Sequence, residues 1–156
     1  MADRQAISAS AIAEELLEIT GNAMITGDFD AFAAAFHLPN TMTTSSGTIV
    51  VADEDHLRRV FNGVREKLKN AGITELVRFV EVAEFRSPTQ IASTHISYLL
   101  SGGSQLEDPY PVFSIIELID GDWKGVSSDY AVKPRGAQES AILGSGAPCP
   151  IPGNKE

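Results

Sequence analysis

The feature that most constrains this chain is a change in hydrophobic periodicity near residue 73. Before it, apolar residues recur every three or four positions, and after it apolar and polar residues alternate. Four alternating segments (75–86, 91–101, 110–120 and 122–132) are rich in β-branched and aromatic residues. Short turn-like stretches separate them, including Asp120-Gly121, a pair typical of a two-residue hairpin. The pattern predicts an α+β domain whose C-terminal half is an antiparallel meander.

Three helices are predicted before the strands. The first spans residues 10–26, with Ser8 or Ser10 as its cap and Gly27 as its left-handed stop. A short second helix carries Phe29, Phe32 and Phe36, and Leu38-Pro39 is expected to end it. Residues 40–52 resemble a small hairpin. The third helix starts at Asp53 and ends at Gly72, with Leu57, Val60, Phe61, Val64 and Leu68 on one face.

Composition limits the partners and the compartment. The chain has 156 residues and a net charge of −9, which repels nucleic-acid backbones and anionic lipid. No apolar run is long enough for a membrane helix, and Glu14, Glu15 and Glu18 interrupt any signal-peptide core. The single cysteine, Cys149, forms no intramolecular disulfide, which fits a cytoplasmic location. We therefore expect neither nucleic acid nor membrane as a partner.

The chain is predicted to divide into one domain, residues 1–132, and a tail, residues 133–156. The tail is rich in proline and glycine and shows little periodicity. Its apolar residues Ala141, Ile142 and Leu143 are expected to dock on the domain or on a neighbouring chain.

The element order resembles that of the nuclear transport factor 2-like superfamily, which includes SnoaL-like cyclases, ketosteroid isomerases and scytalone dehydratases. The resemblance covers about residues 8–132 and is carried by TGDFDAFAAAF, by LRRVF and by IDGDWKGVSSDYA. It implies a cystatin-like α+β cone, with N-terminal helices packed on a strongly curved antiparallel β-sheet. It also implies a small apolar pocket and a homodimer through the outer sheet face. Activity does not follow from such a fold.

The enzymatic branches of that superfamily use side chains that this chain does not reproduce. Ketosteroid isomerases resemble one another in a tyrosine and two acids, and the early helices here carry no tyrosine. Scytalone dehydratase-like enzymes use paired histidines with tyrosines and an aspartate, at a spacing that His37 and His95 do not match. We carry over the fold and the pocket, without a reaction.

Three residues are candidates for chemistry. His37 follows the Phe-rich helix and either borders the pocket or is a solvated helix-end residue. His95 shares one strand face with Ser93 and Ser97, and that face is either concave, toward the pocket, or convex. If Trp123 points inward, alternation also carries Asp129 inward, where it could pair with a histidine; otherwise Asp129 ends the strand in solvent.

Other side chains bear on the pocket and its electrostatics. Glu81 and Glu117 lie within strands, and cross-strand pairing with Arg78 or Arg86 is their expected fate. Neither a Cys/His metal spacing nor a nucleophile elbow is present in the sequence, so no cofactor and no metal are expected. Large apolar residues that either line a ligand pocket or simply fill the core are Met24, Phe32, Phe36, Met42, Phe61 and Trp123.

Two functions are consistent with these features. The first is a SnoaL-like protein that binds a small apolar molecule; if catalytic, it would be a cofactor-free isomerase, cyclase, dehydratase or hydrolase. The second is a non-catalytic homodimeric interaction module, because apolar residues occur on both faces of strands 91–101 and 110–120. Two apolar faces need two coverings, and a second copy is a common one.

Overall fold

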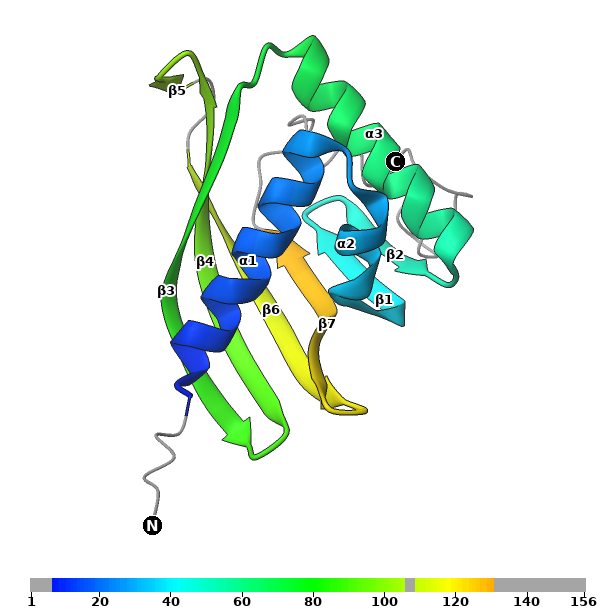
Figure 1. Ribbon diagram of the computed structural model, residues 1–156, viewed down its shortest axis with the longest axis vertical. Coiled ribbons are helices and arrows are strands. Elements are labelled where there is room, and N and C mark those ends of the chain that lie inside the picture. The colour runs from blue at the N-terminus through cyan, green and yellow to red at the C-terminus, as the bar shows by residue number, and fades with distance from the viewer. Residues whose placement is uncertain (1–6, 106–108, 131–156) are drawn as a thin grey trace.

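The computed structural model describes residues 7–105 and 109–130 (Figure 1). Three helices precede or interrupt the sheet: α1 (Ala9–Thr26), α2 (Phe29–Ala34) and α3 (Glu54–Asn70). The strands are β1 (Phe36–Thr44), β2 (Gly47–Val51), β3 (Glu75–Ser87), β4 (Gln90–Ser101), β5 (Ser104–Gln105), β6 (Tyr110–Ile119) and β7 (Asp122–Tyr130). Cys149 and the predicted docking of residues 141–143 lie outside the described residues.

The strands form one curled sheet in the order β2-β1-β7-β6-β4-β3, with β5 attached to β4. The predicted α+β class with helices on a curved sheet is confirmed, and so is the predicted meander of β3, β4, β6 and β7. The sheet is mixed, however, because β1 pairs with β7 in parallel. The expectation of an all-antiparallel sheet was therefore wrong at this junction. Alternation within a strand cannot reveal which distant strand lies beside it.

Helix α1 lies across the concave side of the sheet (Figure 1). Ser8 caps it, since its Oγ accepts a hydrogen bond of 3.0 Å from the Ala11 N–H. Gly27 ends it with φ 86°, a left-handed conformation that glycine adopts without steric cost. Ile12 and Ala23 are buried as predicted, but Ile19 is 37% exposed and does not belong to the buried stripe.

Helix α2 is shorter than predicted. It ends at Ala34, and Phe36 already belongs to β1, so Leu38-Pro39 lies within a strand and does not terminate the helix. The backbone N–H of Gly125 on β7 donates a 2.9 Å hydrogen bond to the Ala35 carbonyl. Pairing with β7 therefore begins directly after the helix. The helix ends several residues before Pro39, which was expected to end it.

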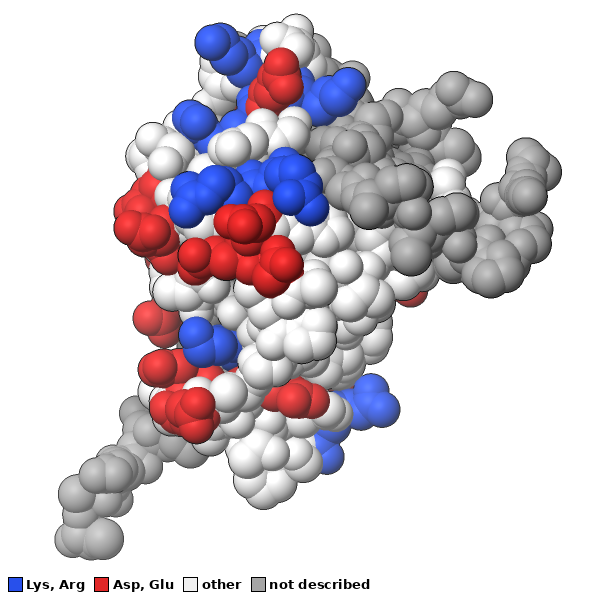
Figure 2. All heavy atoms as spheres, turned by 90° about the vertical axis from the view of Figure 1, so that its right-hand side faces the viewer, with Lys and Arg blue, Asp and Glu red and all other residues white. Residues whose placement is uncertain are grey.

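Helix α3 matches its prediction closely. Asp53 caps it through a 2.9 Å bond from the His56 N–H to the Asp53 carboxylate, and its predicted apolar face is buried. Its outward side carries charges of both signs. Figure 2, which views the molecule from the side of α3, shows Lys and Arg interspersed with Asp and Glu. None of the described helices is both long and apolar enough to cross a membrane.

Two β-bulges decide which side chains face inward. Ile115 pairs with Ser127 while Ile116 pairs with Gly125, so Val126 is an extra residue on β7. In the same way, Val80 pairs with His95 and Val82 with Thr94, which leaves Glu81 extra on β3. Each bulge reverses the alternation beyond it, because side chains of a strand otherwise point to opposite faces with a period of two.

The buried core consists of a large cluster and two smaller ones. The large cluster joins α2, α3 and the β1–β2 hairpin to the end of α1, and its centre is a set of aromatic contacts among Phe29, Phe32 and Phe61. A second cluster joins the start of α1 to Ile91 and Ile116. Between these two clusters, polar side chains of β3 and β4 lie on the concave side of the sheet.

Candidate functional site

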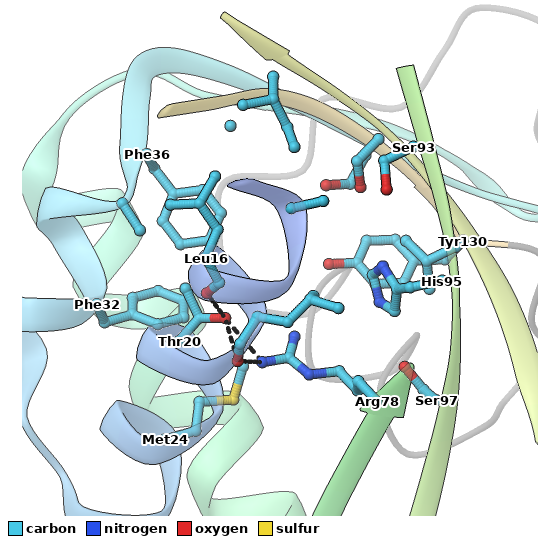
Figure 3. Close-up of a pocket in the computed structure, with 18 of the residues that line it drawn as sticks. Leu16, Thr20, Met24, Phe32, Phe36, Arg78, Ser93, His95, Ser97 and Tyr130 are labelled. Carbon is cyan, nitrogen blue, oxygen red and sulfur yellow. Dashed lines mark hydrogen bonds between the residues drawn. The ribbon is translucent and has the colours of Figure 1, made fainter. Parts of the chain in front are cut away.

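A cavity of about 90 Å³ lies between α1 and the concave face of the sheet (Figure 3). It is smaller than the several hundred Å³ that is usual for ligand sites. Its apolar wall comes mainly from the helices and β1, and its polar wall from β3, β4, β6 and β7. The residues that line it include Ala13, Leu16, Leu17, Thr20, Met24, Phe32, Phe36, Met42, Arg78, Ser93, His95, Ser97, Val112, Ser114, Gly125, Ser128 and Tyr130.

The polar face of β4 is the concave one. Ser93, His95 and Ser97 all line the cavity and are 3%, 7% and 3% exposed. Of the two orientations that the sequence left open for His95, the structure has the inward one. Alternation on a well-paired central strand fixes all three side chains together.

His95 is held in its neutral form. Burial, and secondly the positive charge of Arg78, lower the pKa of His95 to about 3. At neutral pH the imidazole therefore has one nitrogen that donates a hydrogen bond and one that accepts. Such a ring can position a polar ligand atom, but it is a weak base as long as Arg78 is beside it and no negative charge is present.

Arg78 reaches from β3 toward α1. One terminal nitrogen, Nη2, donates 2.7 Å hydrogen bonds to the Leu17 carbonyl and to Thr20 Oγ1 (Figure 3). Thr20 Oγ1 in turn donates to the Leu16 carbonyl at 3.0 Å. The guanidinium thus joins β3 to the middle of α1, where Thr20 can accept its hydrogen bond.

The Arg78 charge has no acidic counterpart within the part of the chain that the structure describes. Its hydrogen-bond acceptors there are a carbonyl and a hydroxyl, and burial lowers the pKa of Arg78. Tyr130 is partly buried beside it, and burial of its hydroxyl group raises the pKa of the phenol, with Arg78 and Ser128 opposing the rise. The raised pKa keeps the Tyr130 phenol neutral at neutral pH, and an arginine guanidinium is not deprotonated in proteins. One cation and one neutral phenol therefore share the cavity.

Sequence reasoning missed Arg78 and Tyr130 as site residues. Arg78 was expected to pair across strands with Glu81 or Glu117, but Glu81 is exposed at the β3 bulge. Glu117 accepts a 2.9 Å hydrogen bond from Gln90 Nε2. An arginine within a strand usually faces solvent. The only signal in the sequence was the position of Arg78 in the strand. Leu76 and Val80, two positions before and after it, share its face and are apolar, which is typical of an inward face.

Asp129 does not enter the cavity. It is exposed, and it pairs with Phe113 on the outer face of the sheet. The prediction that Trp123 would carry Asp129 inward was wrong because the Val126 bulge reverses the alternation between them. Ser128 and Tyr130 face the cavity in its place.

His37 is not a cavity residue either. It is partly exposed on β1, and the residues that line the cavity do not include it. Of the two positions that the sequence allowed for His37, the structure therefore excludes the pocket wall.

Four of the six large apolar candidates line the cavity: Met24, Phe32, Phe36 and Met42. Phe61 is 2% exposed and packs against Phe29 and Phe32 in the core instead. Trp123 lies outside the cavity, with its ring centroid 5.9 Å from that of Phe85. Phe61 and Trp123 are therefore removed from the pocket, and the ligand-binding role of the other four stays a prediction.

The cavity offers hydrogen-bond donors and one positive charge, with an apolar wall opposite. Its lining includes hydroxyl groups, a neutral imidazole and a guanidinium, and no aspartate or glutamate among the described residues. Within residues 7–105 and 109–130, no group of three or more His, Cys, Asp or Glu is arranged to hold a metal ion. The arrangement can recognise a small molecule with a polar end and an apolar body.

Comparisons with known proteins agree with this fold. An NTF2-like protein of unknown function from Shewanella oneidensis MR-1 is 13% identical, with a TM-score of 0.61 over 77% of this chain and 96% of that one. A domain of unknown function with a cystatin-like fold from Nostoc punctiforme is 14% identical, with a TM-score of 0.62 over 86% and 83%. A ketosteroid isomerase-like protein from Erwinia carotovora atroseptica SCRI1043 is 14% identical, with a TM-score of 0.58 over 80% and 97%.

At these identities the solved structures establish the fold alone. No curated protein matches the chain. A family model described as NTF2-like protein (DUF6841) matches residues 11–128, which span every described helix and strand of the curled sheet apart from a few terminal residues. The chain belongs to this NTF2-like family.

Proposed function

We propose that this NTF2-like domain binds a small, predominantly apolar molecule in the cavity between α1 and the sheet. The observation that carries the proposal is the cavity itself, whose apolar wall faces a wall of hydroxyl groups, His95 and Arg78. The hydroxyl groups and the neutral imidazole of this wall can hydrogen-bond a polar atom of a guest. The opposite wall suits the apolar remainder of the same molecule.

The size of the cavity limits the occupant. A cavity of about 150 Å³ accommodates benzene, so the cavity of about 90 Å³ here corresponds to a smaller compound. Met24 and Met42 line the apolar wall, and methionine side chains adapt to the shape of a neighbour more readily than branched ones. The cavity can therefore widen modestly around a guest.

A direct test uses neutral apolar probes and the methyl groups of the cavity methionines. Xenon and 2-propanol are added to protein labelled at methionine methyl groups, and we expect the NMR signals of Met24 and Met42 to shift with saturation. Gly125→Leu should abolish the shifts by filling the cavity. Gly125→Ala is the matched control, because a Cβ at this position would lie 3.6 Å from Phe36, an ordinary contact.

Both variants should unfold cooperatively, which separates loss of the cavity from loss of the fold. Methionine signals that do not respond to any probe in the folded wild-type protein would contradict the proposal. So would probe binding that persists unchanged in folded Gly125→Leu.

The candidates for chemistry are separated by the same measurement. If His95 contributes to the site, His95→Asn should change the affinity for a hydrogen-bonding probe such as 2-propanol. His37→Gln and Asp129→Asn should not, because neither side chain lines the cavity. Equal effects of all three substitutions would show that His95 has no special position. We propose no reaction, since no acid and no strong base occur among the described residues that line the cavity.

A second candidate function, homodimerisation, is favoured by the outer face of the sheet. Phe79, Val82 and Phe113 point away from the helices and are 56%, 48% and 43% exposed. Phe79 packs edge-on against Tyr98 on the neighbouring strand, at 5.8 Å between centroids. An apolar patch that spans three strands is unusual for a monomer surface, and a second copy of the same face would cover it.

Sedimentation velocity tests this second proposal. The wild-type chain should sediment as a dimer at micromolar concentrations, and the double substitution Phe79→Lys, Phe113→Lys should sediment as a monomer. Val50→Lys is the matched control, because Val50 is 54% exposed on β2, away from this face. A wild-type monomer at all concentrations would exclude the dimer.

A further inference from the structure

The cavity excludes negative charge although the chain as a whole is strongly acidic. The sequence has 21 acidic and 12 basic residues. Among the described residues that line the cavity there is no acidic side chain, and the one charged side chain is Arg78. The charge in the cavity is therefore positive, opposite in sign to the net charge of the molecule.

The guanidinium of Arg78 has N–H donors that make no hydrogen bond within the described residues. It carries five N–H groups, and both of its hydrogen bonds within the described residues leave from Nη2. Figure 3 shows these two bonds as dashed lines toward α1, while the other terminal nitrogen is directed into the space beside His95. Nε and Nη1 therefore remain for a partner that the described part of the chain does not supply.

A buried cation is costly unless a negative group neutralises it. The carbonyl and hydroxyl oxygens that contact Arg78 carry partial charges only. Both hydrogens of Nη2 are used on α1, so no parallel pair of N–H groups is left for a two-point contact. A carboxylate would instead accept a charge-assisted hydrogen bond from Nη1, which is stronger than one between neutral groups, and would neutralise the cation. Ser97, on the strand position paired with Arg78, and the neutral His95 provide further donors next to the same space.

The opposite wall determines the chemistry of the rest of the ligand. Met24, Phe32 and Phe36 present carbon and sulfur to the cavity and provide no hydrogen bond to a second polar group of the ligand. The volume of about 90 Å³ limits the whole guest to a few non-hydrogen atoms. A dicarboxylate, a hydroxylated acid or a long fatty acid does not fit this combination.

We propose that the cavity recognises a short unbranched monocarboxylate of about two to four carbons, with its carboxylate on Arg78 and its alkyl end against Met24, Phe32 and Phe36. The proposal rests on the proposed function, since it requires that the cavity admits a ligand. It adds the charge and the size of that ligand. Arg78 is thereby a binding residue that both anchors α1 and selects the anion.

The decisive experiment compares acids with their neutral amides. Acetate, propanoate, butanoate and hexanoate are titrated into wild-type protein, and the Met24 and Met42 methyl shifts are recorded together with the Arg78 Nε–H signal. Binding should be in the millimolar range, as expected for so few contact atoms. Propanoate or butanoate should bind at least about tenfold more tightly than hexanoate and than propanamide or butanamide.

Two substitutions at Arg78 sharpen the result. Arg78→Met should remove the preference for the acid over the amide, and Arg78→Lys should retain part of it through its charge. Chloride and phosphate added at the same ionic strength should not displace the acid, because neither has an alkyl end to fill the apolar wall. The acid–amide comparison in wild-type protein does not depend on whether either variant folds.

The outcomes separate this inference from the proposed function. Acid and amide of equal affinity, or an acid preference that survives in folded Arg78→Met, would overturn the role of Arg78 while leaving a neutral-ligand cavity intact. Displacement by chloride would equally overturn it, by showing a simple anion site. Xenon and 2-propanol failing as well would contradict the proposed function itself.

Discussion

The middle of β4 reverses the usual distribution of polar and apolar side chains between the two faces of a sheet. The concave face of β4, which is covered by α1, carries Ser93, His95 and Ser97, all buried. The convex side carries exposed apolar side chains, among them Phe79 and Phe113. A sheet with one face in water normally places its polar side chains there and its apolar ones inside. This reversal supports both proposals: a ligand would complete the polar patch on the inside, and a second copy would cover the apolar side chains on the outside.

The largest expected effect is a loss of stability in acid that comes from His95 on the concave face. His95 has a pKa of about 3 in the folded chain and 6.5 as its ordinary value. Between these values the unfolded chain binds a proton that the folded chain does not, so the free energy of unfolding falls as pH falls below 6.5. The slope is about 1.4 kcal/mol per pH unit, or roughly 3 kcal/mol from about pH 6 to about pH 4.

Urea unfolding of wild-type and His95→Asn protein at pH 4, 5 and 6 measures this effect. The difference in stability between the two should grow steadily in favour of the variant as the pH falls. His37→Asn serves as the control, because His37 is partly exposed and outside the cavity. A constant difference across the three pH values would mean that His95 is not held neutral by its surroundings.

A smaller effect is expected from substitutions at adjacent positions of β6. Val112 faces inward and is 1% exposed, whereas Phe113 faces outward and is 43% exposed. Val112→Thr adds a buried hydroxyl and should lower the free energy of unfolding by about 1–3 kcal/mol. Phe113→Thr should change it by less than about 0.5 kcal/mol in dilute monomer. Chemical denaturation measures both, and equal costs would break the contrast between the faces.

The smallest expected effect comes from removing the Arg78 charge without ligand. Arg78→Met gives up two hydrogen bonds but also an uncompensated buried cation, and we expect a net gain in stability of about 1 kcal/mol. Arg86→Met on the exposed end of the same strand should have no measurable effect. Thermal unfolding of both variants, without added carboxylates, provides the comparison; a large loss in Arg78→Met would indicate that Arg78 is chiefly structural.

Local signals in the sequence predicted most of the fold. Ser8 and Asp53 cap their helices as expected, and Gly27 ends α1 in the left-handed conformation. Asp120 and Gly121 both have positive φ, 51° and 89°, in the hairpin that their identity predicted. These features depend on neighbours within a few residues. Their physical causes are therefore contained in short stretches of chain.

The site was harder to predict because it depends on long-range geometry. The parallel pairing of β1 with β7 and the extra residues Glu81 and Val126 have no local signature. The Val126 bulge determines that Asp129 points outward and Tyr130 inward.

The positions of Arg78 on β3 and His95 on β4 also depend on long-range geometry. Arg78 was predicted only as a cross-strand partner for Glu81 or Glu117, with Arg86 as the alternative, because a carboxylate buried alone is costly. Only the packing of α1 against β3 shows the actual partners of Arg78. His95 was left between two faces, and the curl of the sheet decided between them.

The extra residue on β7 makes the lining of the cavity tolerant of a change in strand length. Deleting Val126 would restore strict alternation and keep the register, because Ser127 would still pair with Ile115, Ser128 with Ser114 and Tyr130 with Val112. The phenol would therefore stay on the concave face and the Asp129 carboxylate on the outer face. A chain whose β7 is one residue shorter at this point should accept the same ligands, even though its sequence alternates differently along the strand.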